Sequence, residues 1–171
     1  MSVKDWNSIK EVFTLCDLWH AYGGDFKWPQ VDEAFIKNDS ISFDEKKCLI
    51  SLLLLFKQNV PFVNELNLNE KLISLKANIR EPHLVKNEAD CMIWSVTQNG
   101  CPSGNGKVFM FFNLSDEKKD ISLDLKKLFC HKKDLLAVKD VWNDRDLFPV
   151  SSANFFCREL EPHSCEVILF K

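Results

Sequence analysis

Four side chains between residues 25 and 33 are the clearest candidates for chemistry in this sequence. Asp25, Asp32 and Glu33 place three carboxylates near one another along the chain, and Trp28 lies among them. The acids could line the mouth of a binding site, and the apolar face of Trp28 could stack on a sugar ring. The alternative is structural, because clustered acids in a loop are usually solvated and a single tryptophan is usually part of a core.

The histidines offer no second site. They are isolated from one another, and no G-x-S-x-G segment supports a nucleophile with its base. For His163, which follows a proline near the end of the chain, the sequence favours a structural hydrogen bond over catalysis. The four histidines are His20, His83, His131 and His163.

The cysteines are scattered, odd in number and without C-x-x-C spacing. A zinc site needs clustered ligands, so the sequence predicts no metal site, and nothing in it points to a cofactor. The pattern is typical of a reduced, cytoplasmic protein that uses cysteine as a small hydrophobe. The seven are Cys16, Cys48, Cys91, Cys101, Cys130, Cys157 and Cys165.

Composition bounds the class of protein. A chain of 171 residues with 46% hydrophobic and 27% charged residues is globular, and it corresponds to one ordinary domain or two small ones. Its net charge of −3 gives no attraction to nucleic acid or to an anionic membrane. The first ten residues are polar and predict no signal peptide. The apolar run 49–56 is far shorter than the roughly 20 residues that span a bilayer.

The first half alternates helices with short strands. Apolar residues at a helical spacing predict a helix from about Asp5 to Trp19. A capping box at Ser42 and Glu45 predicts a second helix that runs to about Gln58 and buries Phe43 among its apolar residues. Short strands are expected in 25–36 and 60–63, and a third helix in 68–78. Such alternation predicts parallel strands covered by helices, yet two strands cannot close a barrel and would leave open edges.

The second half changes to a period of two. Residues 81–88 are polar and are expected to connect the two parts, and residues 100–106 give a strong turn signal. Short strands separated by turns predict an antiparallel sandwich, with the segment 107–114 at its centre because it is apolar on both faces. The expected strands are 91–97, 108–114, 121–125, 135–142, 155–160 and 165–170, and Trp142 is expected in the core.

An ordered set of motifs resembles the C-terminal portion of glycoside hydrolase family 27, the α-galactosidase-like enzymes. In the first half these are Phe13-Thr14-Leu15-Cys16-Asp17-Leu18-Trp19, Tyr22-Gly23-Gly24, Trp28-Pro29-Gln30-Val31-Asp32 and Phe43-Asp44-Glu45. In the second half they are Phe111-Phe112-Asn113-Leu114-Ser115, Val138-Lys139-Asp140-Val141-Trp142 and Leu160-Glu161-Pro162-His163-Ser164.

The resemblance implies an α+β chain with two parts. Residues 1–80 would be an incomplete (β/α) barrel segment, the last units of a (β/α)8 barrel, and residues 88–171 an antiparallel β-sandwich. The family's retaining mechanism needs two carboxyl groups about 5 to 5.5 Å apart. Both belong to barrel strands for which this chain has no matching residue, so no catalytic residue is assigned. Trp28 and Asp32 match a substrate-binding segment, whereas Gln30 and Glu33 depart from it.

Three functional hypotheses follow from these observations. In the first, the chain is a C-terminal fragment of a retaining glycosidase, inactive alone, that takes a galactoside-type sugar only when the barrel is completed. In the second, it is a non-catalytic carbohydrate-binding or interaction module, which an exposed row of aromatic residues on the sandwich would indicate. In the third, a separate polypeptide supplies the upstream barrel. The open strand edges would also allow self-association.

Overall fold

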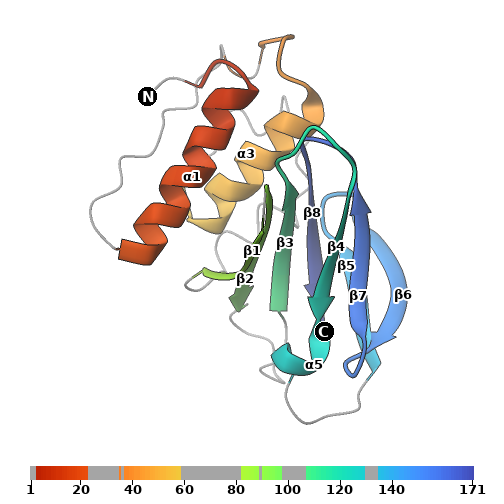
Figure 1. Cartoon of the computed structure of the whole chain (residues 1–171). Coiled ribbons are helices and arrows are strands. Elements are labelled where there is room, and N and C mark those ends of the chain that lie inside the picture. Colours follow the sequence, from red (N-terminus) through yellow and green to blue (C-terminus); the bar gives the residue numbers. More distant parts are fainter. Residues whose placement is uncertain are drawn as a thin grey trace.

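The structure is a computed structural model of the whole chain, and it describes residues 3–22, 35, 37–58, 82–88, 90–97, 107–129 and 135–171. Helices come first, and the antiparallel strands β1 to β8 follow them, with one short helix inserted (Figure 1). The predicted strands at 25–36 and 60–63 and the helix at 68–78 fall largely or wholly outside the described residues.

Two helices cover one side of the sheet. Helix α1 (Trp6–Tyr22) begins after Asp5, whose Oδ1 accepts the backbone N–H of Ser8 at 2.8 Å. Helix α3 (Phe43–Leu55) begins with the predicted capping box, which is confirmed: the Ser42 side chain accepts from the N–H of Glu45, and the Glu45 side chain accepts from the N–H of Ser42. Each cap satisfies backbone donors that a helix N-terminus leaves without partners.

The strands form a six-stranded sheet in the order β1-β2-β3-β8-β5-β6 and a two-stranded sheet, β4-β7. All the pairings are antiparallel. The bounds are β1 (His83–Glu88), β2 (Cys91–Thr97), β3 (Lys107–Asn113), β4 (Lys119–Asp124), β5 (Leu135–Asp140), β6 (Arg145–Ser151), β7 (Phe155–Leu160) and β8 (Ser164–Phe170), with the short helix α5 (Leu125–Leu128) after β4.

The six-stranded sheet is the middle of three layers, because apolar side chains cover both of its faces. One face packs on the helices, where Phe13 of α1 meets the Phe112 ring at a centroid distance of 4.8 Å. The other packs on β4 and β7, where Phe111 lies 5.9 Å from Phe156. Adjacent residues of a strand point to opposite faces, so neighbouring phenylalanines of β3 belong to different cores. The predicted central position of β3 is confirmed, since β2 and β8 flank it.

The structure corrects several details of the sequence interpretation. The segment 81–88, expected to be a connection, contains β1, the edge strand next to β2. Strand β6 was not expected at all. The strand predicted for 135–142 ends at Asp140, where a turn begins. Phe43 is 57% exposed instead of buried, because it is the first residue of α3 and lies outside the face that contacts the sheet.

The sandwich is therefore present, whereas no strand precedes β1 among the described residues and the barrel segment stays a prediction. None of the helices in the described ranges is long and apolar enough to cross a membrane.

Candidate functional site

The sequence-predicted site cannot be placed in space. Trp28 and Asp32, together with Asp25 and Glu33, lie outside the described residues. The candidate sites that the structure does describe lie elsewhere. One is a small polar cavity at the junction of the helices and the sandwich, and the other is an apolar groove at the open side of the sandwich.

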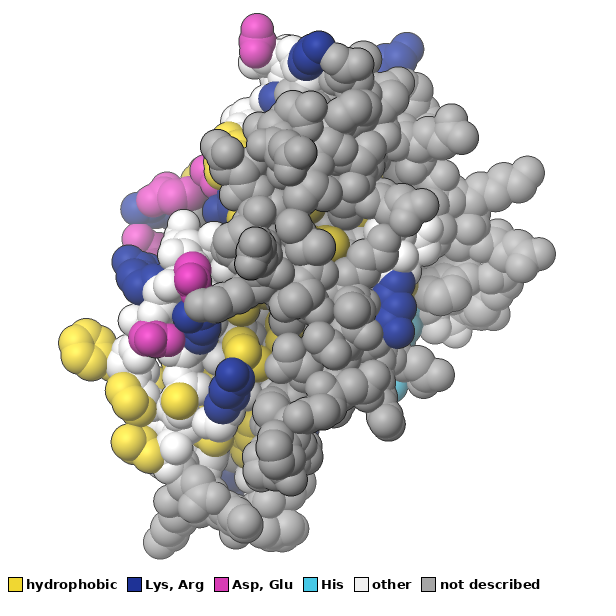
Figure 2. All heavy atoms as spheres, turned by 180° about the vertical axis from the view of Figure 1, so that it is seen from behind, with side chains coloured by type: hydrophobic (Ala, Val, Ile, Leu, Met, Phe, Trp, Pro, Cys, Tyr) yellow, Lys and Arg dark blue, Asp and Glu magenta, His cyan; other side chains and the backbone are white. Residues whose placement is uncertain are grey.

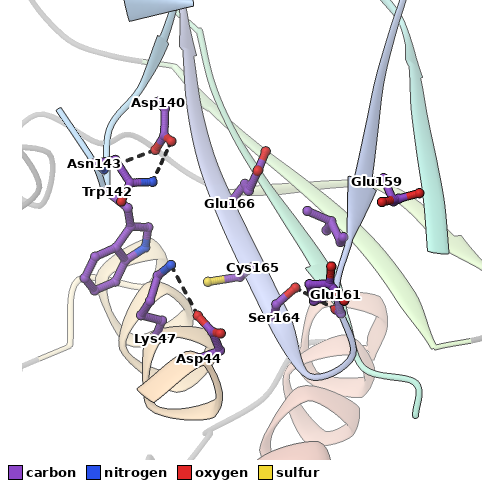
Figure 3. A pocket seen from close by; sticks show the side chains of 11 residues that line it. Asp44, Lys47, Asp140, Trp142, Asn143, Glu159, Glu161, Ser164, Cys165 and Glu166 are labelled. Atoms are coloured by element: carbon purple, nitrogen blue, oxygen red, sulfur yellow. Dashed lines mark hydrogen bonds and ion pairs between the residues drawn. The ribbon is translucent and has the colours of Figure 1, made fainter. Parts of the chain in front are cut away.

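The junction cavity lies where α3 meets the turn after β5 and the turn into β8 (Figure 3). Its volume is about 170 Å³, below the range of roughly 300 to 1,000 Å³ that is typical of small-molecule sites. Carboxylates dominate its lining, which consists of Asp44, Lys47, Asp140, Trp142, Asn143, Glu159, Leu160, Glu161, Ser164, Cys165 and Glu166.

Every carboxylate of the junction cavity has a polar partner. Asp140 is 1% exposed and accepts hydrogen bonds from the backbone N–H of Asn143 at 3.2 Å and from its side-chain amide at 2.7 Å. Glu166 is held bidentately by Arg158, with distances of 2.5 and 2.6 Å. The remaining pairs are Asp44 with Lys47 at 3.5 Å, and Glu159 and Glu161 with Lys118 at 3.0 and 2.8 Å.

This pairing decides how the acids can act. A general acid must deliver a proton to a substrate oxygen, and a nucleophile must approach an anomeric carbon. Here the carboxylates accept hydrogen bonds and ion pairs within α3, within the turn after β5 and within the sandwich. The junction cavity is a polar seam between two layers of the fold, lined from α3 on one side and from the sandwich on the other.

Trp142 closes one side of this seam. Its indole N–H donates to the Ser51 hydroxyl at 2.9 Å, and the Lys47 ammonium lies 5.3 Å from its ring centroid. The expectation that Trp142 belongs to the core is only partly right, because the ring is partly buried and packs on the core from the cavity wall. An amphipathic side chain at such a border can bury its ring and still bond through its polar edge.

His163 makes a second polar contact between the helices and the sandwich, outside the lining of the junction cavity. It has φ 53° in the turn before β8, and its ring stacks on Trp6 with centroids 4.3 Å apart. Nδ1 lies 3.0 Å from Oε1 of Glu45, and Nε2 lies 2.6 Å from Oδ1 of Asp116. The structure thus shows the structural hydrogen bonding that the sequence favours for this residue. The partners come from α3 and from the loop after β3, which sequence reasoning could not bring together.

The apolar groove lies between β6 and β7, the outer strands of the two sheets on this side. Its volume is about 620 Å³, and two aromatic rings line it with large exposed fractions, 93% for Phe148 and 65% for Phe155. Figure 2 shows hydrophobic side chains gathered at the lower left, on the side where β6 lies. The groove is lined by Arg145, Asp146, Leu147, Phe148, Pro149, Val150, Phe155, Phe156, Cys157 and Arg158.

Metal ligation has no support in the described ranges, where no group of three or more His, Cys, Asp or Glu side chains could hold an ion. Of the other histidines, His20 packs edge-on against Trp94 at 5.1 Å, and His83 is exposed at the start of β1. His131 lies outside the described residues.

Comparison with known proteins gives a family for the second half of the chain. Residues 90–170 match the family model described as the alpha galactosidase C-terminal beta sandwich domain. No sequence among the curated proteins matches the chain.

Solved structures resemble nearly the whole chain. A proposed alpha-N-acetylgalactosaminidase from Bacillus halodurans has a TM-score of 0.78 at 18% identity, over 98% of this chain and 43% of that one. A family 27 β-L-arabinopyranosidase from Geobacillus stearothermophilus has a TM-score of 0.75 at 20% identity, over 98% and 42%. An alpha-galactosidase from Saccharomyces cerevisiae has a TM-score of 0.62 at 11% identity, over 87% and 47%.

At such identities the likeness shows the fold alone, and the chain spans less than half the length of each of these structures. The residues that match the family model contain strands β2 to β8 of the sandwich. The structural likeness extends over 98% of the chain and so includes the helices α1 and α3. Residues 90–170 match the alpha-galactosidase C-terminal β-sandwich family model, in a chain whose fold is similar to part of the family 27 glycoside hydrolases.

Proposed function

We propose that this chain is the C-terminal part of an α-galactosidase-like retaining glycoside hydrolase and does not catalyse by itself. The observation that carries the proposal is the likeness over 98% of this chain to only 43% of a longer protein, together with the family match of residues 90–170. The second half supplies a β-sandwich, and the catalytic carboxylates come from a part of the fold that this chain does not match.

The packing of the described residues supports a scaffolding role. Buried side chains of α1 and α3 share one apolar cluster with β2, β3 and β8, so the helices and the sandwich form one packed block. The carboxylates at their junction are engaged in pairs, as described above. In a complete enzyme, such a block would hold the end of a barrel in place through α1 and α3.

Substrate contacts follow from the resemblance. Trp28 and Asp32 would contact a galactoside-type sugar once the barrel is complete, with Trp28 stacking on the ring and Asp32 accepting from its hydroxyls. The proposal includes no cofactor, no nucleic-acid partner and no membrane partner, and it places the protein in the cytoplasm. An upstream barrel, on the same or a separate polypeptide, is the partner it requires.

Hydrolysis of aryl glycosides tests this proposal. The purified chain is assayed with p-nitrophenyl α-galactoside, α-N-acetylgalactosaminide and β-L-arabinopyranoside, and we expect turnover equal to that of buffer alone. The proposal is overturned if the chain hydrolyses one of these substrates and Asp32→Asn abolishes the activity. Asp39→Asn, at an exposed position, is the control and should leave such activity intact. Addition of a separately expressed upstream barrel should create activity if the two pieces assemble.

A second candidate function is favoured by the β6–β7 groove. Its volume is about 620 Å³, within the range of ligand sites, and it presents the exposed rings of Phe148 and Phe155. Exposed aromatic rings are the feature expected of a carbohydrate-binding or interaction module. Arg145 and Asp146 also line the groove and add a positive and a negative side chain that can hydrogen bond.

Thermal denaturation with sugars tests this alternative. A ligand at 100 times its dissociation constant stabilises the folded state by about 2.7 kcal/mol. Galactose, melibiose or raffinose should therefore raise the melting temperature of the chain, and Phe148→Ala with Phe155→Ala should remove the shift. Phe43→Ala, which truncates an exposed ring at a distance from the groove, is the matched control. No shift with any of the three sugars would argue against sugar binding.

A further inference from the structure

Two buried cysteines from segments far apart in the sequence meet at the junction of α3 and β8. The Cys48 thiol, on α3, donates to the backbone carbonyl of His163 at 3.5 Å. One turn further along α3, the Ser51 hydroxyl lies 3.4 Å from the sulfur of Cys165, the second residue of β8. Positions i and i+3 share a helix face, so both contacts lie on one face of α3. Cys48 therefore contacts the backbone two residues before Cys165, and Cys165 contacts the side chain one turn after Cys48.

The two sulfurs have different surroundings. Cys165 lines the junction cavity, and Figure 3 shows its sulfur pointing from β8 toward α3. The Trp142 indole N–H donates to the Ser51 oxygen, and either the Ser51 hydroxyl or the Cys165 thiol can donate to the other. Lys47 lines the same cavity and brings a positive charge toward it. Cys48 is fully buried beneath, with no part of it in the cavity lining.

These surroundings act on the acidity of the two thiols. Burial opposes ionisation of Cys165, but the neighbouring Cys48 and Ser51 side chains and the charge of Lys47 leave the pKa of this thiol below its usual value. Burial, and after it the neighbouring Cys165, raises the pKa of Cys48 well above its usual value. The two cysteines thus differ in position and in acidity. Cys165 lines the cavity and has the lower pKa, whereas Cys48 lies outside the lining and has the higher pKa.

We propose that Cys48 and Cys165 are a redox-active pair that closes to a disulfide across the helix–sandwich junction on exchange with a small-molecule disulfide. The Cys165 thiolate attacks one sulfur of the reagent, forms a mixed disulfide and releases one thiolate. Cys48 loses its proton and attacks the Cys165 sulfur, which forms the internal disulfide and expels the second thiolate. The protein dithiol is oxidised, and the reagent is reduced to two thiols.

The bond would fasten α3 to β8, and with it the helical layer to the sandwich. It would close a loop of more than a hundred residues, and cross-links over long loops restrict the unfolded chain most. This inference depends only on the seam and is independent of the proposed glycosidase role.

Oxidation with glutathione disulfide tests the pair in the full chain. The reduced protein is incubated with oxidised and reduced glutathione at several ratios, quenched in acid, alkylated and digested for mass spectrometry. We expect a peptide pair joined through Cys48 and Cys165, and a melting temperature roughly 5 to 10 °C higher than that of the reduced protein. The proposal is overturned if both Cys48 and Cys165 are still fully alkylated at the highest ratio of oxidised to reduced glutathione. This outcome can be read from the wild-type chain alone.

Single variants then assign the order of attack. Cys48→Ser should trap glutathione on Cys165, whereas Cys165→Ser should leave Cys48 unmodified because it lacks a path to the cavity. Cys157→Ser, which removes an exposed thiol on β7, should still form the internal bond. A cross-link that requires Cys157, or glutathione that accumulates on Cys48 first, would contradict the mechanism.

Discussion

The imidazole of His163 and the carboxylate of Glu45 join the sandwich to the helical layer, with Nδ1 of the ring 3.0 Å from Oε1 of the acid. The other oxygen of the same carboxylate, Oε2, accepts the backbone N–H of Ser42 at 2.7 Å. One side chain thus caps the first turn of α3 and binds the turn that leads into β8. The start of α3 is positioned by the second half of the chain as well as by its own sequence.

Removal of the Glu45 carboxylate should cost more stability than removal of the cap alone. Ser42→Ala removes one capping interaction and should lower the free energy of unfolding by about 1 kcal/mol. Glu45→Ala also breaks the contact with His163, so we expect about 2 to 3 kcal/mol. Urea denaturation of both variants provides the comparison. Equal losses would show that the contact with His163 contributes nothing to stability.

Asn113 should tolerate no change of its amide. It is fully buried, and its Nδ2 donates to the carbonyls of Glu117, Leu160 and Glu161 at 2.8 to 3.1 Å. Asn113→Asp keeps the shape but turns a carboxylate oxygen toward these carbonyls, so we expect a loss of about 3 kcal/mol or more. Ser115→Ala, which removes a hydroxyl that bonds to Asn113 Oδ1 and to the backbone of Glu117, should cost about 1 kcal/mol. Denaturant unfolding that gives similar losses for both would contradict this assignment.

The two faces of β3 should respond separately to truncation. Phe112 packs on Phe13 of α1, and Phe111 packs on Phe156 of β7. Each change to alanine should cost about 3 to 5 kcal/mol. Hydrogen exchange should then accelerate mainly in α1 for Phe112→Ala and mainly in β4 and β7 for Phe111→Ala. Identical exchange patterns would mean that the two cores do not loosen independently.

Asp5 should make the stability depend on acid pH. Hydrogen bonds from the side chain and then the backbone of Ser8 lower its pKa below the ordinary value of 3.8. A lowered folded-state pKa gives stabilisation that is present above the unfolded pKa and is lost as the pH falls through the folded one. The part of the stability difference between wild type and Asp5→Ala that depends on the charge of Asp5 should therefore disappear as the pH falls below the lowered pKa. Asp5→Asn keeps an oxygen that can cap the helix but does not titrate, so its free energy of unfolding should lack this acid-dependent loss. Wild type and Asp5→Asn that lose stability in parallel as the pH falls would contradict the prediction.

How far the sequence predicts the fold depends on how strongly each segment is buried. The capping box of α3 and the central position of β3 were predicted, since a local motif and an apolar pattern on both faces specify them. The strands β1 and β6 were missed because both are half-exposed edge strands, and Pro149 in β6 argues against a strand. An edge position leaves no alternation of apolar residues for a sequence pattern to reveal.

The contacts of His163 could not be predicted, for a different reason. Glu45, Asp116 and His163 lie in three separate segments, and only the packing of α3 on β8 brings them together. The same holds for Cys48 and Cys165, which only that packing brings to one junction. Single-sequence patterns report local periodicity, whereas these contacts depend on the tertiary arrangement.

The most direct test of the central claim is covalent trapping of a catalytic nucleophile. A retaining glycosidase forms a covalent glycosyl-enzyme, which a mechanism-based fluorinated galactosyl fluoride holds long enough for intact-mass measurement. The account predicts that the purified chain keeps its unmodified mass after incubation with this reagent. A gain of one fluorogalactosyl unit, mapped by digestion to an Asp or Glu of this chain, would contradict it.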